Sequence, residues 1–184
     1  EIIGEGQCIV ARMAALYGQI SDFSCARCVM CREGSWQLSA IFNDMASGHA
    51  STEDIVLVEE IAPMISAGSL CEFGRKMVGA GLSAVQLHKE PFKNHIDTRL
   101  CADDQCEGLK KYLIDPAVCS GCGDCLDACP EDAITGQPGF IHMIEENYCN
   151  RCGKCAEACE EKAVKRTGGR MKVPKRLTKV GRFH

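Results

Sequence analysis

Aromatic residues and long apolar runs are both scarce in this chain of 184 residues. Only 5% of the residues are aromatic, and Trp36 is the single tryptophan. A core so poor in aromatic rings must rely on aliphatic side chains and methionine, or on an inorganic group. No apolar run approaches the roughly 18 residues of a membrane-spanning helix, and the sequence opens without a signal-peptide pattern. The sequence therefore predicts a protein with no membrane span.

Acidic residues are missing from the C-terminal end. None of the 25 Asp and Glu residues follows Glu161, whereas residues 162–184 contain nine of the 21 Lys and Arg residues. The tail over residues 167–184 spreads its charges among glycines and Pro174, which predicts an extended basic strap on an acidic surface of a partner. A solvated, disordered end is the alternative. Nucleic-acid binding is disfavoured, because Phe183 is the only aromatic ring of the tail available for stacking on bases.

Cysteine, in contrast, is abundant at 15 residues. The odd count and the missing secretory pattern argue against a disulfide framework. Two identical C-x2-C-x2-C-x3-C runs stand 30 positions apart, and zinc sites instead usually pair two C-x2-C units. Such runs ligate four-iron clusters, with the fourth cysteine of each run binding the cluster of the other run. The runs are Cys119, Cys122, Cys125 and Cys129, and Cys149, Cys152, Cys155 and Cys159.

The two runs belong to a longer internal repeat. At the same offset of 30 positions, Gly123 matches Gly153, Ala128 matches Ala158, and residues 131–134 match residues 161–164. This is a duplicated half-domain. Residues 115–166 resemble a bacterial-type ferredoxin that carries two [4Fe-4S] clusters. With crossed ligation, cluster one takes Cys119, Cys122, Cys125 and Cys159, and cluster two takes Cys149, Cys152, Cys155 and Cys129.

The preceding residues follow a helical pattern. Apolar residues recur at helical spacing over residues 9–20 and 38–45, and Ser51 is a candidate N-cap for a third helix that Pro63 should kink or end. A fourth helix is expected over residues 75–89. We therefore predict an α+β chain: a helical bundle over residues 1–97, a linker over 98–114, a two-cluster ferredoxin domain over 115–166 and a basic tail over 167–184.

A third cluster site is predicted in the bundle. Cys25, Cys28 and Cys31 have C-x2-C-x2-C spacing, and Cys71 stands forty residues further on. The alternative is that Cys71 is merely a small buried residue. The segments SCARCVMCREG and SLC, followed by residues 94–96, resemble the C-terminal iron–sulfur domain of the flavin-bearing, NADH-oxidising subunit of respiratory complex I. That resemblance implies a small helical bundle with one [4Fe-4S] cluster on these four cysteines.

The fusion of the two modules resembles the corresponding subunit of soluble NAD(P)-linked hydrogenases, formate dehydrogenases and electron-bifurcating complexes. The resemblance implies three [4Fe-4S] clusters that relay single electrons in the cytoplasm of an anaerobic cell. It places FMN and NAD(P) on a flavoprotein partner or on an upstream domain, and a hydrogenase, formate dehydrogenase or ferredoxin, with further iron–sulfur subunits, at the other end. A free-standing electron carrier and a redox sensor or adaptor are the alternatives.

No active site is evident within the chain itself. The motif Gly79-x-Gly81-x-x-Ala84 superficially fits a dinucleotide fingerprint, but it lies in a helical pattern with no preceding strand. Close helix packing is the better interpretation of these small residues. No acid–base pair or activated nucleophile is identifiable, so the chain is expected to be the electron-transfer part of an oxidoreductase.

Three cysteines remain outside the cluster motifs. Cys101 and Cys106 lie in the linker, His95 precedes them, and Cys8 is an available fourth ligand if the first helix packs beside the linker. Three thiolates and one imidazole suit a structural zinc ion, and the resemblance also suggests a metal here. Free thiols, or a buried Cys8 without metal, are the alternatives. No functional role is predicted for three further histidines, His88, His142 and His184.

Overall fold

The computed structural model describes residues 6–183, which form two compact units, Glu1–Leu109 and Lys110–His184. The segment expected as a linker is divided between them. Its residues up to Leu109 belong to the first unit, and the first strand of the second unit begins at Lys111. Among the described residues, no helix is both long enough and apolar enough to cross a bilayer.

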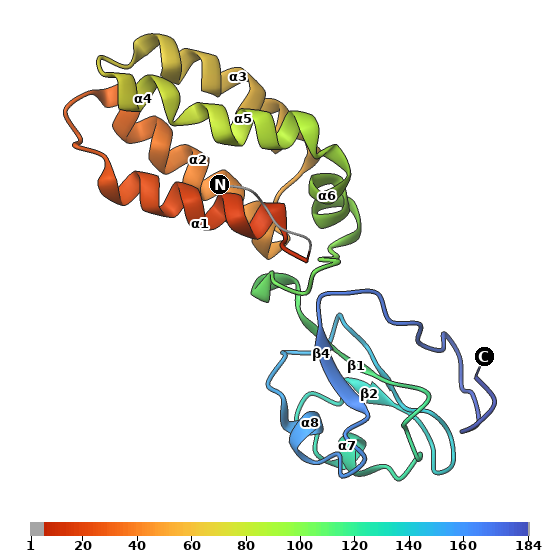
Figure 1. Ribbon diagram of the computed structural model, residues 1–184. Helices are drawn as coiled ribbons and strands as arrows, with labels where there is room; N and C mark the ends of the chain where they lie inside the picture. Colours follow the sequence, from red (N-terminus) through yellow and green to blue (C-terminus); the bar gives the residue numbers. More distant parts are fainter. Residues whose placement is uncertain (1–5, 184) are drawn as a thin grey trace. The chain divides into compact units, whose positions relative to one another are not determined.

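The first unit is a helical bundle. Its four longer helices, α1 (Ile9–Phe23), α2 (Val29–Ser47), α3 (Thr52–Gly68) and α5 (Val78–Leu87), lie side by side. The short helix α4 (Glu72–Lys76) lies at the same end of the bundle as the connection between α1 and α2 (Figure 1). Helix α6 (Lys89–Lys93), the π-helical turn η1 (Asn94–Thr98) and the 3-10 turn η2 (Glu107–Leu109) complete the unit.

Two expectations for these helices need correction. The expected N-terminus at Ser51 is present, where the Asp54 carboxylate accepts the backbone N–H of Ser51 at 2.7 Å. The alternative that Pro63 ends this helix is wrong, because α3 continues through Pro63 to Gly68. Pro63 is exposed, so water can hydrate the carbonyl it leaves free, and buried residues on both sides of it hold the helix together. The helix expected over residues 75–89 is divided into α4, α5 and α6.

Three aromatic rings, those of Tyr17, Phe42 and Phe92, are buried together in the bundle. Tyr17 and Phe42 stack with ring centroids 4.9 Å apart, and both are fully buried. Tyr17 donates its hydroxyl hydrogen to the carbonyl of Met77 at 2.9 Å and accepts the N–H of Gly81 at 3.0 Å. A Cβ atom at Gly81 would stand 2.6 Å from the Tyr17 oxygen. Gly81 of the glycine motif thus allows α5 to pack closely, as expected for a helix interface, whereas Gly79 faces open space.

The second unit contains two small antiparallel sheets and two short helices. Strand β1 (Lys111–Ile114) pairs with β4 (Val164–Thr167), and β2 (Ile134–Thr135) pairs with β3 (Met143–Ile144). Helices α7 (Asp124–Asp127) and α8 (Lys154–Glu157) each begin after a glycine with positive φ. The backbone repeats the sequence duplication, because the Asp115 and Glu145 N–H groups donate to Ala163 and Ala133 at 2.8 Å each.

The C-terminal strap, residues 168–183, packs on the second unit itself. Ile141 donates its backbone N–H to Thr178 at 2.9 Å, and Val180 donates to Gly139 at 3.2 Å. Phe183 packs against the buried core of the same unit. The disordered alternative therefore does not describe these residues. The strap pairs with backbone groups of residues 139–141 that would otherwise be open to solvent.

Candidate iron–sulfur and metal centres

Four cysteines lie at one end of the helical bundle. Cys25, Cys28 and Cys31 occupy the connection from α1 and the start of α2, and Cys71 is the N-cap of α4 (Figure 1). The Cys71 sulfur accepts the backbone N–H of Gly74 at 3.5 Å. Backbone N–H groups at helix N-termini stabilise negative charge, so these positions suit thiolate ligands.

The electrostatics of the Cys31 thiol connect the four cysteines. Burial raises the pKa of Cys31, and the Cys28, Cys71 and Cys25 sulfurs raise it further. A hydrogen bond from the Leu70 backbone lowers the pKa of Cys28. The segment before α4 therefore lies beside the α1–α2 connection, and Cys71 meets cysteines that stand 40 to 46 positions earlier in the sequence.

The second unit sorts its eight cysteines in the same way. Burial, together with the nearby sulfurs of Cys119, Cys122, Cys159 and Cys155, raises the pKa of Cys125 to about 12. The pKa of Cys155 is raised by burial and by the sulfurs of Cys149 and Cys129, and these three cysteines line one narrow cavity with Cys152. The fourth cysteine of each run thus lies beside the run of the other half, as crossed ligation requires.

Backbone hydrogen bonds to sulfur repeat between the halves. Ala133 donates its N–H to the Cys129 sulfur, and Ala163 donates to the Cys159 sulfur, at 3.3 Å in both cases. Such bonds stabilise the negative charge of a thiolate ligand. Iron that binds the raised-pKa thiols displaces their protons, so the sites fit clusters that bind thiolates.

A different site lies in the first unit, where three cysteines and one histidine are buried together. Their four ligand atoms all lie within 4.8 Å of one another, and the residues are Cys8, His95, Cys101 and Cys106. The His95 Nε2 atom stands 3.3 Å from the Cys8 sulfur and 3.3 Å from the Cys106 sulfur. The two sulfurs are 3.7 Å apart.

These distances fit a single small ion. Two thiolates at about 2.3 Å from a tetrahedral zinc ion lie about 3.8 Å apart. The His95 Nδ1 atom donates to the Pro91 carbonyl at 2.7 Å, which leaves Nε2 without a proton and free to bind metal. The hydrogen bond with Cys106 lowers the pKa of the Cys8 thiol against the effect of its burial, and His95 lowers it further. The donor set therefore suits zinc.

Comparison with protein-family models divides the chain in the same way. Residues 9–95 match the NADH-ubiquinone oxidoreductase-F iron-sulfur binding region, and residues 118–163 match a 4Fe-4S dicluster domain. The chain joins an F-type iron–sulfur region to a dicluster domain. The recognition of both modules and the α+β fold predicted from the sequence are confirmed.

Curated relatives come from three kinds of oxidoreductase. This chain is 30% identical to HndC, a subunit of the NADP-reducing hydrogenase of Solidesulfovibrio fructosivorans, over 135 residues, 73% of this chain and 28% of HndC. It is 27% identical to the F-type subunit of the NADH-quinone oxidoreductase of Streptomyces coelicolor, over 54% of this chain and 22% of that protein. The beta subunit of the NADP(+)-dependent formate dehydrogenase of Moorella thermoacetica is 28% identical over 48% of this chain and 13% of its own length.

The chain thus spans less than a third of these relatives. Among solved structures, an NAD+-reducing [NiFe]-hydrogenase in the H2-reduced state matches 49% of this chain and 16% of its own, with a TM-score of 0.47 and 19% identity.

Sequence reasoning missed two residues of these sites. Beside the metal site of the first unit, the Gln105 side chain accepts the Cys8 N–H at 3.1 Å and donates to the Gly6 carbonyl at 2.9 Å. These bonds connect the segment before α1 to the metal site.

In the dicluster domain, the His142 ring is buried, with Nδ1 3.9 Å from the Cys119 sulfur. Burial lowers the pKa of His142. The repeat offset of 30 positions was the available signal for His142, since it pairs this residue with Tyr112.

Proposed function

We propose that this chain is a relay that carries single electrons through three [4Fe-4S] clusters. The observation that carries the proposal is that cysteines distant in sequence lie together in two domains of iron–sulfur type, in groups compatible with three sets of four ligands. A cluster with four thiolate ligands has no open coordination position, so its chemistry is one-electron exchange. The protein supplies thiolates, hydrogen bonds to sulfur and a buried setting that tune this exchange.

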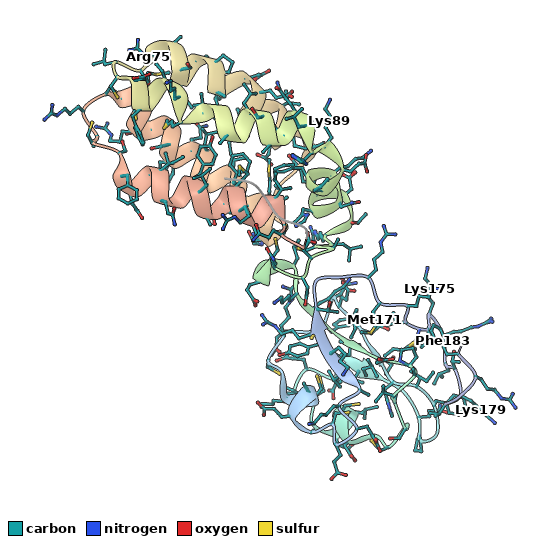
Figure 2. All side chains as sticks on the ribbon, viewed as in Figure 1. Arg75, Lys89, Met171, Lys175, Lys179 and Phe183 are labelled. Carbon is teal, nitrogen blue, oxygen red and sulfur yellow. The ribbon has the colours of Figure 1, made fainter. Side chains whose placement is uncertain are left out.

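The F-type region is the proposed entrance for electrons from NAD(P)H. A flavin on another chain or on a preceding domain would supply the conversion of a hydride into single electrons. Support comes from the exposed apolar side chains beside the bundle cysteines, where Phe23 is 80% and Leu70 is 79% exposed. Exposed apolar groups of this size gather at interaction sites. We infer that a flavin-bearing domain covers this end of the bundle, near Arg75 (Figure 2).

The dicluster domain is the proposed exit toward a terminal partner. The relatives named above are subunits of an NADP-reducing hydrogenase, an NADH-quinone oxidoreductase and a formate dehydrogenase. By this analogy the partner is a hydrogenase, a formate dehydrogenase or a ferredoxin, joined through further iron–sulfur subunits. Exposed clusters and thiols suffer oxidation, so the proposed setting is the cytoplasm of an anaerobic cell.

Zinc is proposed for the buried site of Cys8, His95, Cys101 and Cys106. The ion would hold the segment from η1 to η2 against the start of α1, and this segment is the last of the first unit before the dicluster domain begins. Its four ligands come from the start of α1, from η1 and from the residues between η1 and η2. A closed four-ligand site of this kind is structural.

The strap is proposed to receive an acidic partner, although it packs on its own domain. It carries six basic residues and no acidic one, and Leu177 and Val180 are 50% and 38% exposed among them. An apolar centre within a charged rim is typical of a transient interface. The basic residues are Arg170, Lys172, Lys175, Arg176, Lys179 and Arg182, of which Lys175 and Lys179 are labelled in Figure 2.

Replacing Lys175, Arg176 and Lys179 with glutamine tests this surface. We expect the second-order rate of electron transfer to an acidic two-cluster ferredoxin to fall about tenfold at low salt, because steering of the encounter is electrostatic. The difference should shrink as salt rises. The control is Lys89→Gln with Lys93→Gln, two exposed residues of α6. Equal rates for both variants and the parent at low salt, measured by stopped flow, would exclude the strap as a docking surface.

The whole proposal is tested by native mass spectrometry with metal analysis of anaerobically purified protein. We expect about 12 Fe per chain as three four-iron clusters, one zinc, and a stable complex with a flavoprotein. About 8 Fe would mean that the assignment of the bundle cysteines is wrong. A monomer with the full iron content favours the free-standing carrier, and a complex with a regulator in place of a flavoprotein favours the sensor.

A further inference from the structure

The internal repeat of the dicluster domain differs at one pair of matched positions. Tyr112 and His142 each precede the first cysteine of a run by seven residues. The residues two positions after them are paired equivalently, since Ile114 pairs with Val164 and Ile144 pairs with Ile134. The two halves therefore place a phenol at one position and an imidazole at the other.

The histidine contacts a cysteine of cluster one. His142 is 1% exposed, and its Nδ1 atom lies 3.9 Å from the Cys119 sulfur. The ring fits because residue 136 is glycine, and a Cβ atom there would collide with the imidazole. An imidazole N–H that faces a thiolate can donate a hydrogen bond to it.

The tyrosine has a different contact near cluster two. Tyr112 lines a narrow cavity with Cys129, Cys149 and Cys155, and its hydroxyl oxygen would stand 2.8 Å from a Cβ atom at Gly153. Within residues 6–183, no hydrogen bond is present between Tyr112 and a cysteine sulfur. The duplicated positions thus give the two cluster sites unequal hydrogen bonding.

We propose that His142 donates its Nδ1–H to the Cys119 thiolate and thereby makes cluster one the more easily reduced member of the pair. The proposal rests on the proposed occupancy of both sites by four-iron clusters. Reduction adds one negative charge to a cluster, and hydrogen bonds to its sulfur ligands stabilise that charge. Dithionite is oxidised and gives up one electron, which therefore reduces the cluster bound by Cys119. The histidine keeps its proton in this step. The electron leaves for the partner from this resting position.

The test is an anaerobic redox titration of the full chain, followed by electron paramagnetic resonance. In His142→Phe, which keeps a ring but loses the donor, electron sharing between the two clusters should shift about tenfold toward cluster two, or about 59 mV for one electron. His142→Gln retains an N–H donor and should restore most of the difference. The control Tyr112→Phe should leave both potentials unchanged, because among the described residues its hydroxyl makes no hydrogen bond to a cysteine sulfur.

A second readout separates the hydrogen bond from a packing effect. In protein labelled with 15N-histidine, the singly reduced parent should show a nitrogen coupling to the cluster electron by pulsed resonance, and His142→Phe should lose it. If His142→Phe fails to bind iron, Tyr112→His provides the test in the other half and should raise the potential of cluster two. Unchanged potentials in a variant with full iron content overturn the role of His142 and leave the relay intact. A parent protein without iron in the dicluster domain overturns the relay itself.

Discussion

Replacing Cys101 with serine is expected to remove about one zinc ion per chain and to leave the iron content unchanged. Cys101 is fully buried among Cys8, His95 and Cys106, and none of these four residues belongs to the cysteine groups of the clusters. A hydroxyl at this position is a much poorer zinc ligand than a thiolate. Plasma mass spectrometry of the anaerobic protein measures both metals.

The same variant should lose stability in its first unit. A cross-link that closes a loop of about 100 residues contributes about 4.7 kcal/mol by constraining the unfolded chain, and a four-ligand ion that joins Cys8 to Cys106 constrains a loop of similar size. We expect the free energy of unfolding to fall by about 4 kcal/mol and the Tm of this unit to fall by roughly 15 °C. Calorimetry of the holo protein measures the change.

A matched control for the zinc prediction is His88→Gln. His88 is exposed and lines the open pocket beside the metal site, but it is not one of the four ligands. This variant should keep its zinc and its Tm. Zinc that persists in the Cys101→Ser protein would show that the ion binds elsewhere. The buried cysteines Cys8, Cys101 and Cys106 would then be free thiols.

Local spacing made most of the iron sites predictable. The cysteines of one run reach a common site through short loops, so the sequence alone brings Cys119, Cys122 and Cys125 together. The meeting of Cys71 with Cys31 depends on the packing of α4 against α2, which no local pattern reports. The resemblance to known iron–sulfur subunits supplied that link. Spacing alone could not predict the buried metal site, since Cys8 and His95 are 87 positions apart. That prediction also used the preference of zinc for thiolate and imidazole ligands.

Long-range backbone pairing explains where the sequence misled. The strap is rich in charge and glycine, which is compatible with a solvated, disordered end, yet its backbone pairs with residues 139–141. Such pairing depends on the unpaired edge of a distant loop and leaves no pattern in the strap itself. The exposed Pro63 likewise sits in a helix whose buried side outweighs the lost hydrogen bond. No role was predicted for His142, but its ring is buried and its Nδ1 atom lies 3.9 Å from the Cys119 sulfur.

Two serine variants distinguish the entrance of the relay from its exit. Cys25 and Cys122 are both exposed and both belong to a C-x2-C-x2-C run, so their replacement disturbs little packing. Each variant is expected to lose about four iron atoms per chain, one cluster. In a complex with the proposed flavoprotein partner, Cys25→Ser should slow the reduction of the dicluster domain by NAD(P)H about 100-fold, because the proposed entrance precedes both other clusters. Dithionite should still reduce that domain, since it bypasses the entrance.

Cys122→Ser is the matched control, and it reverses the pattern. Its bundle cluster should be reduced by NAD(P)H at the parental rate, whereas delivery of electrons to the terminal partner should fall. The two variants differ in the cluster that they remove. Cys25 lies near Cys31 in the bundle, and Cys122 lies near Cys125 in the dicluster domain. Stopped-flow absorbance and rapid-freeze resonance separate the two clusters. A Cys25→Ser protein that retains all of its iron, or whose dicluster domain is still reduced rapidly by NAD(P)H, would place the entrance elsewhere in the complex and remove the bundle from the electron path.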